Sequence, residues 1–433
     1  MSTESSNHRH APSRRAILTA TAAGGFAAAT AAGIGSAATA AAAGSPAAAS
    51  GPSGKPAASP FPRRPHDFVR VRGGEFTVNG IPRRSAGTNC YYLHYASHYM
   101  IDSVLDNINQ MGLSSVRAWA FLDGPSPDRP ALQPRPYVYN EAAFDSLDYT
   151  VYKAGQLGLR LVLALTNNWP DFGGMDQYVS WFGAAGHDDF YTDPKIRACY
   201  KAWAAHVIGR RNRYTGLRYD ADPTVMTWEL ANEPRCRSDK SGDTLVRWAD
   251  EMSRYVAHLA KRQLVSVGDE GFYGDPTASD YPYSNYEGVD WKRLAALPAV
   301  DYATTHLYPI SWGETADPRA WGHTWITDHI RDAKKLGKPV VIEEFGLPDT
   351  TQTPGFDEDT RVATYTDWTG AVRSAGGSGD MAWLVTALTD DGTPYGDYDG
   401  FRIIYPSRTA AVLSAHARAQ ESWGPDSKHR VGL

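Results

Sequence analysis

The segment Thr224-Val225-Met226-Thr227-Trp228-Glu229-Leu230 is an apolar run that ends abruptly in Ala231-Asn232-Glu233-Pro234. A second run, Val340-Val341-Ile342, ends in the same way, in Glu343-Glu344-Phe345-Gly346. Short apolar runs of this kind are typical of strands in a parallel sheet. The sequence therefore predicts two strands that each deliver a carboxylate at their end.

Similar runs recur along the chain and alternate with longer amphipathic segments. One such segment has apolar residues at helical spacing, which predicts a helix that covers the sheet: Leu245, Trp248, Met252, Tyr255, Val256 and Leu259. Eight strands separated by helices indicate an α/β protein with a (β/α)8 TIM barrel. The predicted strands are Ser85 to Asn89, Ser115 to Phe121, Arg160 to Leu165, Val225 to Leu230, Leu264 to Val267, Tyr302 to His306, Val340 to Glu344 and Met381 to Thr386.

A short N-terminal β-hairpin is predicted ahead of the barrel. The runs Phe68 to Arg72 and Glu75 to Val78 flank Gly73-Gly74, and a pair of glycines suits a tight turn. The barrel fold matters for function because its active-site residues gather at the carboxyl ends of the strands.

Glu233 and Glu344 end the fourth and seventh predicted strands, which can face each other across the mouth of a barrel. Two carboxyl groups about 5 Å apart suit a glycosidase that retains anomeric configuration. One carboxylate attacks the sugar, while the other donates a proton and later activates water. A single strand-end glutamate is often only a helix cap or a salt-bridge partner, but two in matched positions favour catalysis.

Composition narrows the class of protein. The chain has 433 residues, of which 42% are hydrophobic and 21% charged, and this is typical of a globular protein with a large core. Its net charge is −5, but residues 1 to 65 contribute +5, so the remainder carries −10. A body that acidic argues against nucleic acid as a partner and fits a neutral substrate better.

Aromatic residues are frequent, with 13 Trp and 24 Tyr. Most are expected to fill the core, although exposed rings also serve as platforms on which sugars stack. Their positions in the fold must decide between these roles.

The N-terminus resembles an export signal. Ser13-Arg14-Arg15-Ala16-Ile17-Leu18 opens an apolar, alanine-rich run, which predicts a twin-arginine signal peptide over residues 1 to 43. The alternative is a disordered, low-complexity tail. Residues 44 to 65 are expected to form a linker and residues 66 to 433 the catalytic domain. No later run reaches the length of a membrane span, so we expect a secreted monomer that does not associate with membranes once the signal is removed.

Neither cysteine nor metal chemistry is indicated. The three cysteines, Cys90, Cys199 and Cys236, match no metal motif and allow at most one disulfide. His94 and His98, with a histidine on the sixth strand, raise the question of a metal site. However, zinc needs three or four convergent ligands, and the first strand carries no His-x-His. We expect no metal and no cofactor.

Several segments, in order, resemble one family. From about Phe68 to Ala415 the chain resembles the fungal and plant endo-β-1,4-mannanases of glycoside hydrolase family 5. The matching segments are Gly87-Thr88-Asn89, Val116-Arg117-Ala118-Trp119-Ala120-Phe121, Asn167-Asn168-Trp169 with Phe172-Gly173-Gly174, Trp228 to Cys236, and Gly268-Asp269-Glu270-Gly271-Phe272. In that family Asn-Glu-Pro holds the acid/base and Glu-aromatic-Gly the nucleophile. The resemblance thus implies that Glu233 is the acid/base and Glu344 the nucleophile.

The resemblance also implies roles for polar residues around this pair. Asn232 is expected to hydrogen-bond the sugar 2-hydroxyl, an interaction that strengthens in the transition state. Arg117 and Tyr308 are expected to contact the nucleophile, and His306 to lie near the acid/base. Asn168 belongs to the same predicted substrate-binding set.

Aromatic and charged residues complete the predicted cleft. Trp383 is expected to be the platform beneath the sugar at the cleavage point, with Trp119 and Trp169 on the glycone side. Core packing is the alternative for each ring, since most tryptophans are buried. The resemblance implies that Arg235 and Glu270 hold the aglycone side.

Other residues are expected to be structural. Alternation along the strand points Glu343 away from the barrel axis, and Glu229 is expected to pair with a buried cation. The chain departs from the family at Cys90 and Pro170, which puts the shape of the cleft edge in doubt.

The function expected from the resemblance is a mannan endo-1,4-β-mannosidase that cleaves internal bonds of mannan, glucomannan and galactomannan. An endo-β-1,4-glucanase on the same scaffold is the nearest alternative, because the catalytic pair does not report the orientation of the 2-hydroxyl. A third hypothesis, a sugar-binding barrel without activity, would not need both carboxylates.

Overall fold

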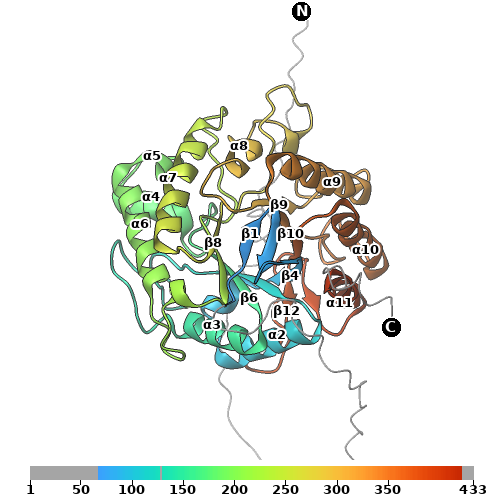
Figure 1. Ribbon diagram of the computed structural model, residues 1–433, viewed down its shortest axis with the longest axis horizontal. Helices are drawn as coiled ribbons and strands as arrows, with labels where there is room; N and C mark the ends of the chain where they lie inside the picture. Colours follow the sequence, from blue (N-terminus) through green and yellow to red (C-terminus); the bar gives the residue numbers. More distant parts are fainter. Residues whose placement is uncertain (1–66, 127–128, 422–433) are drawn as a thin grey trace, which may run out of the picture.

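The computed structural model describes residues 67–126 and 129–421, which surround one eight-stranded sheet (Figure 1). Its strands are β4 (Ser85–Asn89), β5 (Ser115–Trp119), β6 (Arg160–Ala164), β7 (Val225–Glu229), β8 (Leu264–Ser266), β9 (Ala303–Leu307), β10 (Val340–Phe345) and β11 (Gly379–Ala382). Their order is β8-β7-β6-β5-β4-β11-β10-β9, and every pairing is parallel. Backbone bonds from Asp301 N to Val265 O (2.8 Å) and from His306 N to Glu270 O (3.0 Å) join the two ends. The predicted (β/α)8 barrel is confirmed.

Helices form an outer ring around the strands (Figure 1). They are α2 (His98–Gln110), α3 (Asp145–Leu157), α4 (Gly174–Phe182), α5 (Asp189–Thr192), α6 (Pro194–Gly209), α7 (Asp243–Leu259), α8 (Trp291–Ala295), α9 (Pro318–Leu336), α10 (Glu358–Ala375) and α11 (Arg408–Glu421), with short 3-10 turns at η2 (Tyr91–His94), η3 (Tyr219–Ala221) and η4 (Tyr281–Tyr283). The stripe predicted on α7 faces inward, with Leu245, Trp248, Met252 and Val256 buried. That face covers the sheet as expected.

The last predicted strand was wrong in extent. Met381 to Thr386 is not one strand, because β11 ends at Ala382 and Val385–Thr386 forms a separate strand, β12. β12 pairs with β13 (Ile403–Ile404) outside the barrel sheet. All six residues are buried, so an apolar pattern could not reveal where the chain leaves the barrel.

The N-terminal hairpin closes the end of the barrel opposite the carboxyl ends of the strands. Strands β1 (Arg70–Arg72) and β2 (Glu75–Val78) flank the predicted turn, and β3 (Ile81–Arg83) adds a third strand. Gly73 and Gly74 have φ of 58° and 77°, a region that glycine adopts without strain. The apolar side of the hairpin joins one cluster with residues of the barrel strands: Val69, Phe76, Val78, Val162, Met226, Leu264, Tyr302, Val341 and Met381.

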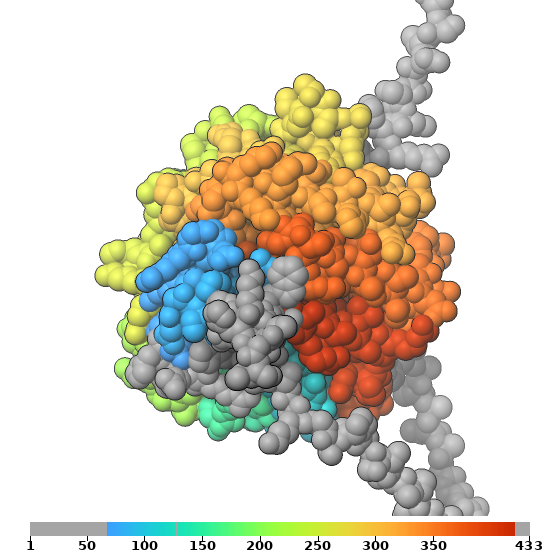
Figure 2. All heavy atoms as spheres, turned by 45° about the vertical axis from the view of Figure 1, so that its right-hand side comes forward, coloured from blue at the N-terminus to red at the C-terminus, as the bar shows by residue number. Residues whose placement is uncertain are grey.

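The outer side of the hairpin lies at the molecular surface (Figure 2, blue), next to the segment drawn in orange. A Cβ added at Gly74 would lie 3.4 Å from the carbonyl oxygen of Gly337, the residue that follows α9. The hairpin is therefore packed on two sides, against the barrel interior and against the end of a helix.

Replacing Phe76 by Ala should lower the free energy of unfolding by about 3–5 kcal/mol, because the fully buried ring would leave a cavity. The turnover number should stay unchanged, since the carboxylates lie at the other end of the barrel. Urea unfolding and initial rates measure the two effects. Ile81→Ala, at a side chain that is 36% exposed, is the control and should cost less than about 1 kcal/mol. A large loss of turnover in folded Phe76→Ala would contradict this separation.

The predicted signal peptide (1 to 43) and linker (44 to 65) lie outside the described residues, and export stays a prediction. Within residues 67–126 and 129–421, no helix combines the length and apolar character needed to cross a membrane.

The three cysteines are free thiols, each buried. Burial raises the pKa of Cys199 to about 11 and that of Cys236 to about 12, and raises the pKa of Cys90 further. Thiols that hold their protons so firmly are poor nucleophiles and metal ligands. Cys90 donates to Val385 O (3.0 Å) within the core, so this departure from the family lies under the cleft rather than at its edge.

Candidate active site

Glu233 and Glu344 lie at the carboxyl ends of β7 and β10, as the strand prediction required. Glu233 has φ of 53°, a left-handed conformation that is uncommon for any residue other than glycine. Its amide donates to Gly268 O (2.8 Å), and this bond holds the unusual turn in place. Backbone conformations of this kind concentrate at functional sites, where surrounding contacts maintain them.

The two carboxylates face each other. One oxygen of Glu233, one oxygen of Glu344 and one nitrogen of His306 all lie within 4.8 Å of one another. Both carboxylates are fully buried, and their partners differ in kind. An oxygen-to-oxygen separation of no more than 4.8 Å fits the short spacing of retaining glycosidases rather than the roughly 6.5–9.5 Å of inverting ones.

Glu344 accepts a hydrogen bond at each oxygen. Arg117 Nη1 donates to Oε1 (2.5 Å) and the Tyr308 hydroxyl donates to Oε2 (2.6 Å). Both donors stabilise a carboxylate anion, and together they fix the plane of the group. These are the contacts that the resemblance implied for the nucleophile.

Arg117 is the centre of a buried network. Its guanidinium makes a bidentate pair with Glu229, at 2.9 Å and 2.6 Å, and also donates to Asn232 Oδ1 (2.7 Å) and Asn89 Oδ1 (3.2 Å). Burial disfavours the charged guanidinium, but the charges of Glu229 and Glu344 outweigh it and raise the pKa of Arg117. The expectation that Glu229 pairs with a buried cation agrees with this geometry.

Glu233 has two different partners. His306 Nδ1 lies 2.8 Å from Oε1, and the Trp169 indole Nε1 donates to Oε2 (2.5 Å). Burial opposes protonation of His306, but the charge of Glu344 and the bond to Glu233 raise its pKa above the ordinary value. The imidazole is therefore well suited to donate toward the carboxylate.

Glu343 points away from this pair. The Tyr302 hydroxyl donates to Glu343 Oε1 (3.2 Å), and the carboxyl is fully buried. Burial, reinforced by the nearby charge of Glu229, raises the pKa of Glu343 well above its usual value. Its orientation and its contact with Tyr302 agree with the structural role predicted for it.

Glu233, His306 and Glu344 converge closely enough to raise the metal question again. However, Arg117 already places a positive charge 2.5 Å from Glu344, and Trp169 and Tyr308 use further carboxylate oxygens. Hydrogen bonds and the Arg117 charge therefore account for this cluster of residues without a metal ion.

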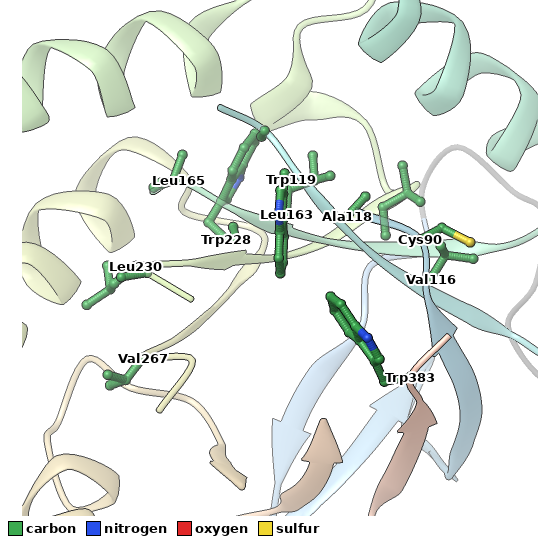
Figure 3. Packing of buried hydrophobic residues seen from close by; sticks show 14 of the residues in the cluster. Cys90, Val116, Ala118, Trp119, Leu163, Leu165, Trp228, Leu230, Val267 and Trp383 are labelled. Carbon is green, nitrogen blue, oxygen red and sulfur yellow. The ribbon is translucent and has the colours of Figure 1, made fainter. Parts of the chain in front are cut away.

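A cleft of about 880 Å³ adjoins the pair and is lined by loops that follow β7 at one end and β11 at the other. These strands are four places apart in the ring, so the cleft crosses the barrel mouth. Trp119 and Trp383 line it, with ring centroids 6.1 Å apart (Figure 3). Tyr91 stacks on Trp383 at 5.7 Å and 15°, which extends the apolar wall.

Trp383 lies just after β11 rather than within a strand. Its indole Nε1 donates to Asp399 Oδ2 (2.8 Å), which fixes the ring at the cleft wall. Trp383 thus lines the cleft from a loop, and its role as a sugar platform stays a prediction.

Arg235 lines the cleft, with Glu270 behind it. Arg235 donates to both carboxylate oxygens of Glu270 (2.6 and 2.8 Å), and its backbone amide donates to Asn168 Oδ1 (3.1 Å). Burial raises the pKa of Glu270 to about 7, against the lowering effect of Arg235. Among the described residues that line the cleft, Arg235 and Asn168 are present and Glu270 is not. Glu270 holds Arg235 in place through this bidentate pair, and its own contact with the substrate stays a prediction.

Trp169 lies with Arg235 rather than with Trp119. The Arg235 guanidinium stacks 4.9 Å from the Trp169 ring, whereas Trp119 contacts Arg117 and Trp383. Both indoles line the same cleft, and their assignment to the glycone side stays a prediction. The side of a cleft on which an indole lies depends on its rotamer, which sequence does not report.

Sequence reasoning missed much of the cleft wall. The residues that it did not single out include Tyr91, Tyr95, Arg129, Tyr395, Tyr398 and Asp399. All of them lie in loops or short turns without a periodic pattern. The only sequence feature that could have indicated them is the high density of aromatic residues near Gly396 and near Cys90. Packing of rings in the core would explain that density equally well.

The family model described as GH family 5 beta-mannosidase-like matches residues 66–368. The chain belongs to glycoside hydrolase family 5. This glycoside hydrolase carries its paired glutamates at strand ends, where the sequence placed them. The predicted membership of the family is confirmed.

Relatives of this family 5 enzyme are known from plants. Mannan endo-1,4-beta-mannosidase 3 of Arabidopsis thaliana is 36% identical over 375 residues, covering 81% of this chain and 89% of that protein. Putative mannan endo-1,4-beta-mannosidase 5 of Oryza sativa subsp. japonica is 37% identical over 384 residues, covering 82% and 77%.

Solved structures agree with the fold of this family 5 enzyme. The endo-beta-1,4-mannanase from Thermotoga petrophila superposes with a TM-score of 0.73 at 41% identity, covering 78% of this chain and 77% of that one. The endo-1,4-beta-mannanase from Rhizomucor miehei gives 0.75 at 34% identity, covering 82% and 99%.

Proposed function

We propose that this glycoside hydrolase is a mannan endo-1,4-β-mannosidase that acts with retention, with Glu344 as nucleophile and Glu233 as acid/base. The observation that carries the proposal is the close pair of buried carboxylates with unequal partners. Relatives that cover four fifths of the chain are named mannan endo-1,4-beta-mannosidases, which supports the substrate class.

In the first step, a Glu344 oxygen attacks the anomeric carbon and forms a covalent glycosyl-enzyme. The bond to the leaving oxygen breaks, and Glu233 transfers its proton to that oxygen. Arg117 and Tyr308 hold the attacking carboxylate in one orientation, which lowers the entropic cost of reaching the transition state.

In the second step, the Glu233 carboxylate takes a proton from water, and that water attacks the anomeric carbon. Glu344 leaves as a carboxylate and again accepts from Arg117 and Tyr308. The same donors that orient the nucleophile thus stabilise the leaving carboxylate. Two inversions at one carbon give net retention.

Asn232 is placed to act on the sugar 2-hydroxyl. Its Oδ1 accepts from Arg117 and its Nδ2 donates to Asn167 Oδ1 (2.9 Å), which fixes the amide. The second N–H of the amide is then available to the substrate. A donor held in place before the reaction stabilises the transition state without reorganising.

The cleft supports endo action, because it crosses the mouth of the barrel and can hold sugars on both sides of the cleavage point. Trp383 forms the floor at that point, and Arg235 contacts the aglycone sugar. Mannan, glucomannan and galactomannan are the proposed substrates.

Product analysis by proton NMR during hydrolysis of mannohexaose tests this proposal. The β-anomer should appear first and mutarotate later, and cleavage should occur at internal bonds. Initial rates on galactomannan should exceed those on carboxymethylcellulose by about 100-fold or more, as expected when a site built to hydrogen-bond the substrate meets an analogue that leaves its polar groups unpaired. First appearance of the α-anomer, or faster cleavage of carboxymethylcellulose, would overturn the assignment.

A further inference from the structure

The two oxygens of Glu233 are held by groups of different chemical character. Trp169 Nε1 donates to Oε2 at 2.5 Å, and His306 Nδ1 lies 2.8 Å from Oε1. An imidazole nitrogen can donate or accept, but an indole N–H can only donate. Oε2 therefore always accepts from Trp169, whether or not the carboxyl carries a proton.

Trp169 is held firmly in this position. Arg235 stacks 4.9 Å from its ring, and Arg235 is itself bound in bidentate fashion by Glu270. The two loops are also joined where Asn168 N donates to Asn232 O (2.9 Å). The indole is half-buried and lines the cleft, so it contacts both the substrate space and the acid/base.

We propose that Trp169 is a positioning residue whose indole N–H strengthens Glu233 as a proton donor and so assists departure of poor leaving groups. The inference rests on the proposed acid/base role of Glu233. It goes beyond the glycone-side lining role predicted for this ring, because the contact that matters is polar and is made with a carboxylate.

The charge on Glu233 changes in each of the two chemical steps. In the first step a proton leaves this carboxyl for the sugar oxygen, and negative charge develops on the carboxylate that accepts from Trp169. A hydrogen bond to an ionised group is stronger than one to its neutral form, so the indole favours proton release. In the second step Glu233 must take up a proton, and the same bond weakens it as a base.

The first step should therefore depend on Trp169 only when the leaving group needs a proton. A mannosyl oxygen is a poor leaving group and requires protonation. A 2,4-dinitrophenolate is a good leaving group and departs as an anion. Two substrates thus separate the polar role of the indole from any stacking by its ring.

Trp169→Phe keeps an aromatic ring and removes the N–H. We expect kcat/KM for mannohexaose to fall about ten-fold or more, as for loss of a hydrogen bond to a charged group. For 2,4-dinitrophenyl β-mannobioside the fall should be less than about three-fold, since that leaving group needs no proton. The alkaline limb of the mannohexaose pH profile should move up by about one pH unit, because a ten-fold loss of stabilisation corresponds to one unit.

Trp383→Phe is the matched control, because it removes an indole N–H that bonds a carboxylate elsewhere in the cleft, at Asp399. Trp383→Phe should lower kcat/KM for both substrates by the same factor and should not shift the pH profile. An equal fall on both substrates in Trp169→Phe, with an unshifted profile, would overturn the proposal. Failure of the proposed function is distinct, since the wild-type protein would then turn over neither substrate.

A measurement on the wild-type protein keeps the proposal testable if Trp169→Phe does not fold. When the NMR chemical shifts of the indole N–H groups are followed against pH, one of them should change with a midpoint equal to that of the alkaline limb of the mannohexaose pH profile. That resonance should stop titrating in Glu233→Gln. If no indole resonance follows the limb, the proposal is wrong.

Discussion

Glu344→Gln should lower kcat on galactomannan by about 10⁴-fold or more, the scale of loss seen when a catalytic nucleophile is removed. Glutamine has the size and shape of glutamate, so the fully buried site should keep its packing. It lacks the charge and nucleophilicity that covalent catalysis requires. Stopped assays with reducing-sugar detection measure the loss, and thermal unfolding checks the fold.

The matched control is the adjacent Glu343→Gln. Glu343 points away from the catalytic pair toward the Tyr302 hydroxyl, and glutamine keeps the size and shape of its side chain. We expect turnover to change by less than about three-fold, since the substitution preserves the shape of a side chain that does not face the substrate. Similar losses in both variants would contradict the assignment of the nucleophile.

Replacing Glu344 by glycine gives a second, independent test of its role as nucleophile. Glu344→Gly opens space beside the anomeric carbon, and azide can enter from the side that the carboxylate occupied. With 2,4-dinitrophenyl β-mannobioside the product should be the α-glycosyl azide. Formation of the β-azide, or no rescue, would argue against attack by Glu344.

Arg117→Lys should lower the free energy of unfolding by about 3–5 kcal/mol and kcat by about 100-fold. The guanidinium bridges Glu229, Glu344 and two asparagines from a fully buried position. A lysine ammonium has three donors on one nitrogen and cannot span these acceptors. Urea unfolding and initial rates measure the two effects in the same preparation.

Arg210→Lys separates stability from catalysis. Arg210 also makes a buried bidentate pair, with Asp148 at 2.9 Å and 2.7 Å, but between α3 and the end of α6. It should lose stability without losing turnover. If Arg117→Lys kept more than a tenth of the wild-type kcat, the orienting role of Arg117 would be wrong.

The strands and both carboxylates could be predicted because their signals are local. An apolar run that stops at Glu233 or Glu344 is visible within a few residues, and the barrel then makes the two carboxylates face each other across its mouth. The hairpin turn at Gly73-Gly74 is local for the same reason. The extent of the last strand could not be predicted, because Trp383 and its neighbours stay buried after the chain leaves the sheet.

The contacts between residues of the site were less predictable than the residues themselves. That Trp169 meets Glu233, or that Glu270 lies behind Arg235, depends on rotamers and on contacts between segments far apart in the chain. The bidentate pair between Arg235 and Glu270 likewise joins loops that follow two different strands. Family resemblance supplied the identity of these residues, and only the fold supplied their geometry.

The pairing of β4 with β11 has a consequence for how the chain reaches its native state. Thr88 Oγ1 donates to Ala382 O across 294 residues, so the seam of the barrel joins the first and last strands of the ring. Contacts between residues so distant in sequence form late and slow folding. A ribosome must therefore deliver nearly the whole chain before the ring can close. Until then β4 and β10 each keep an unpaired edge, and unpaired strand edges are sites at which chains aggregate.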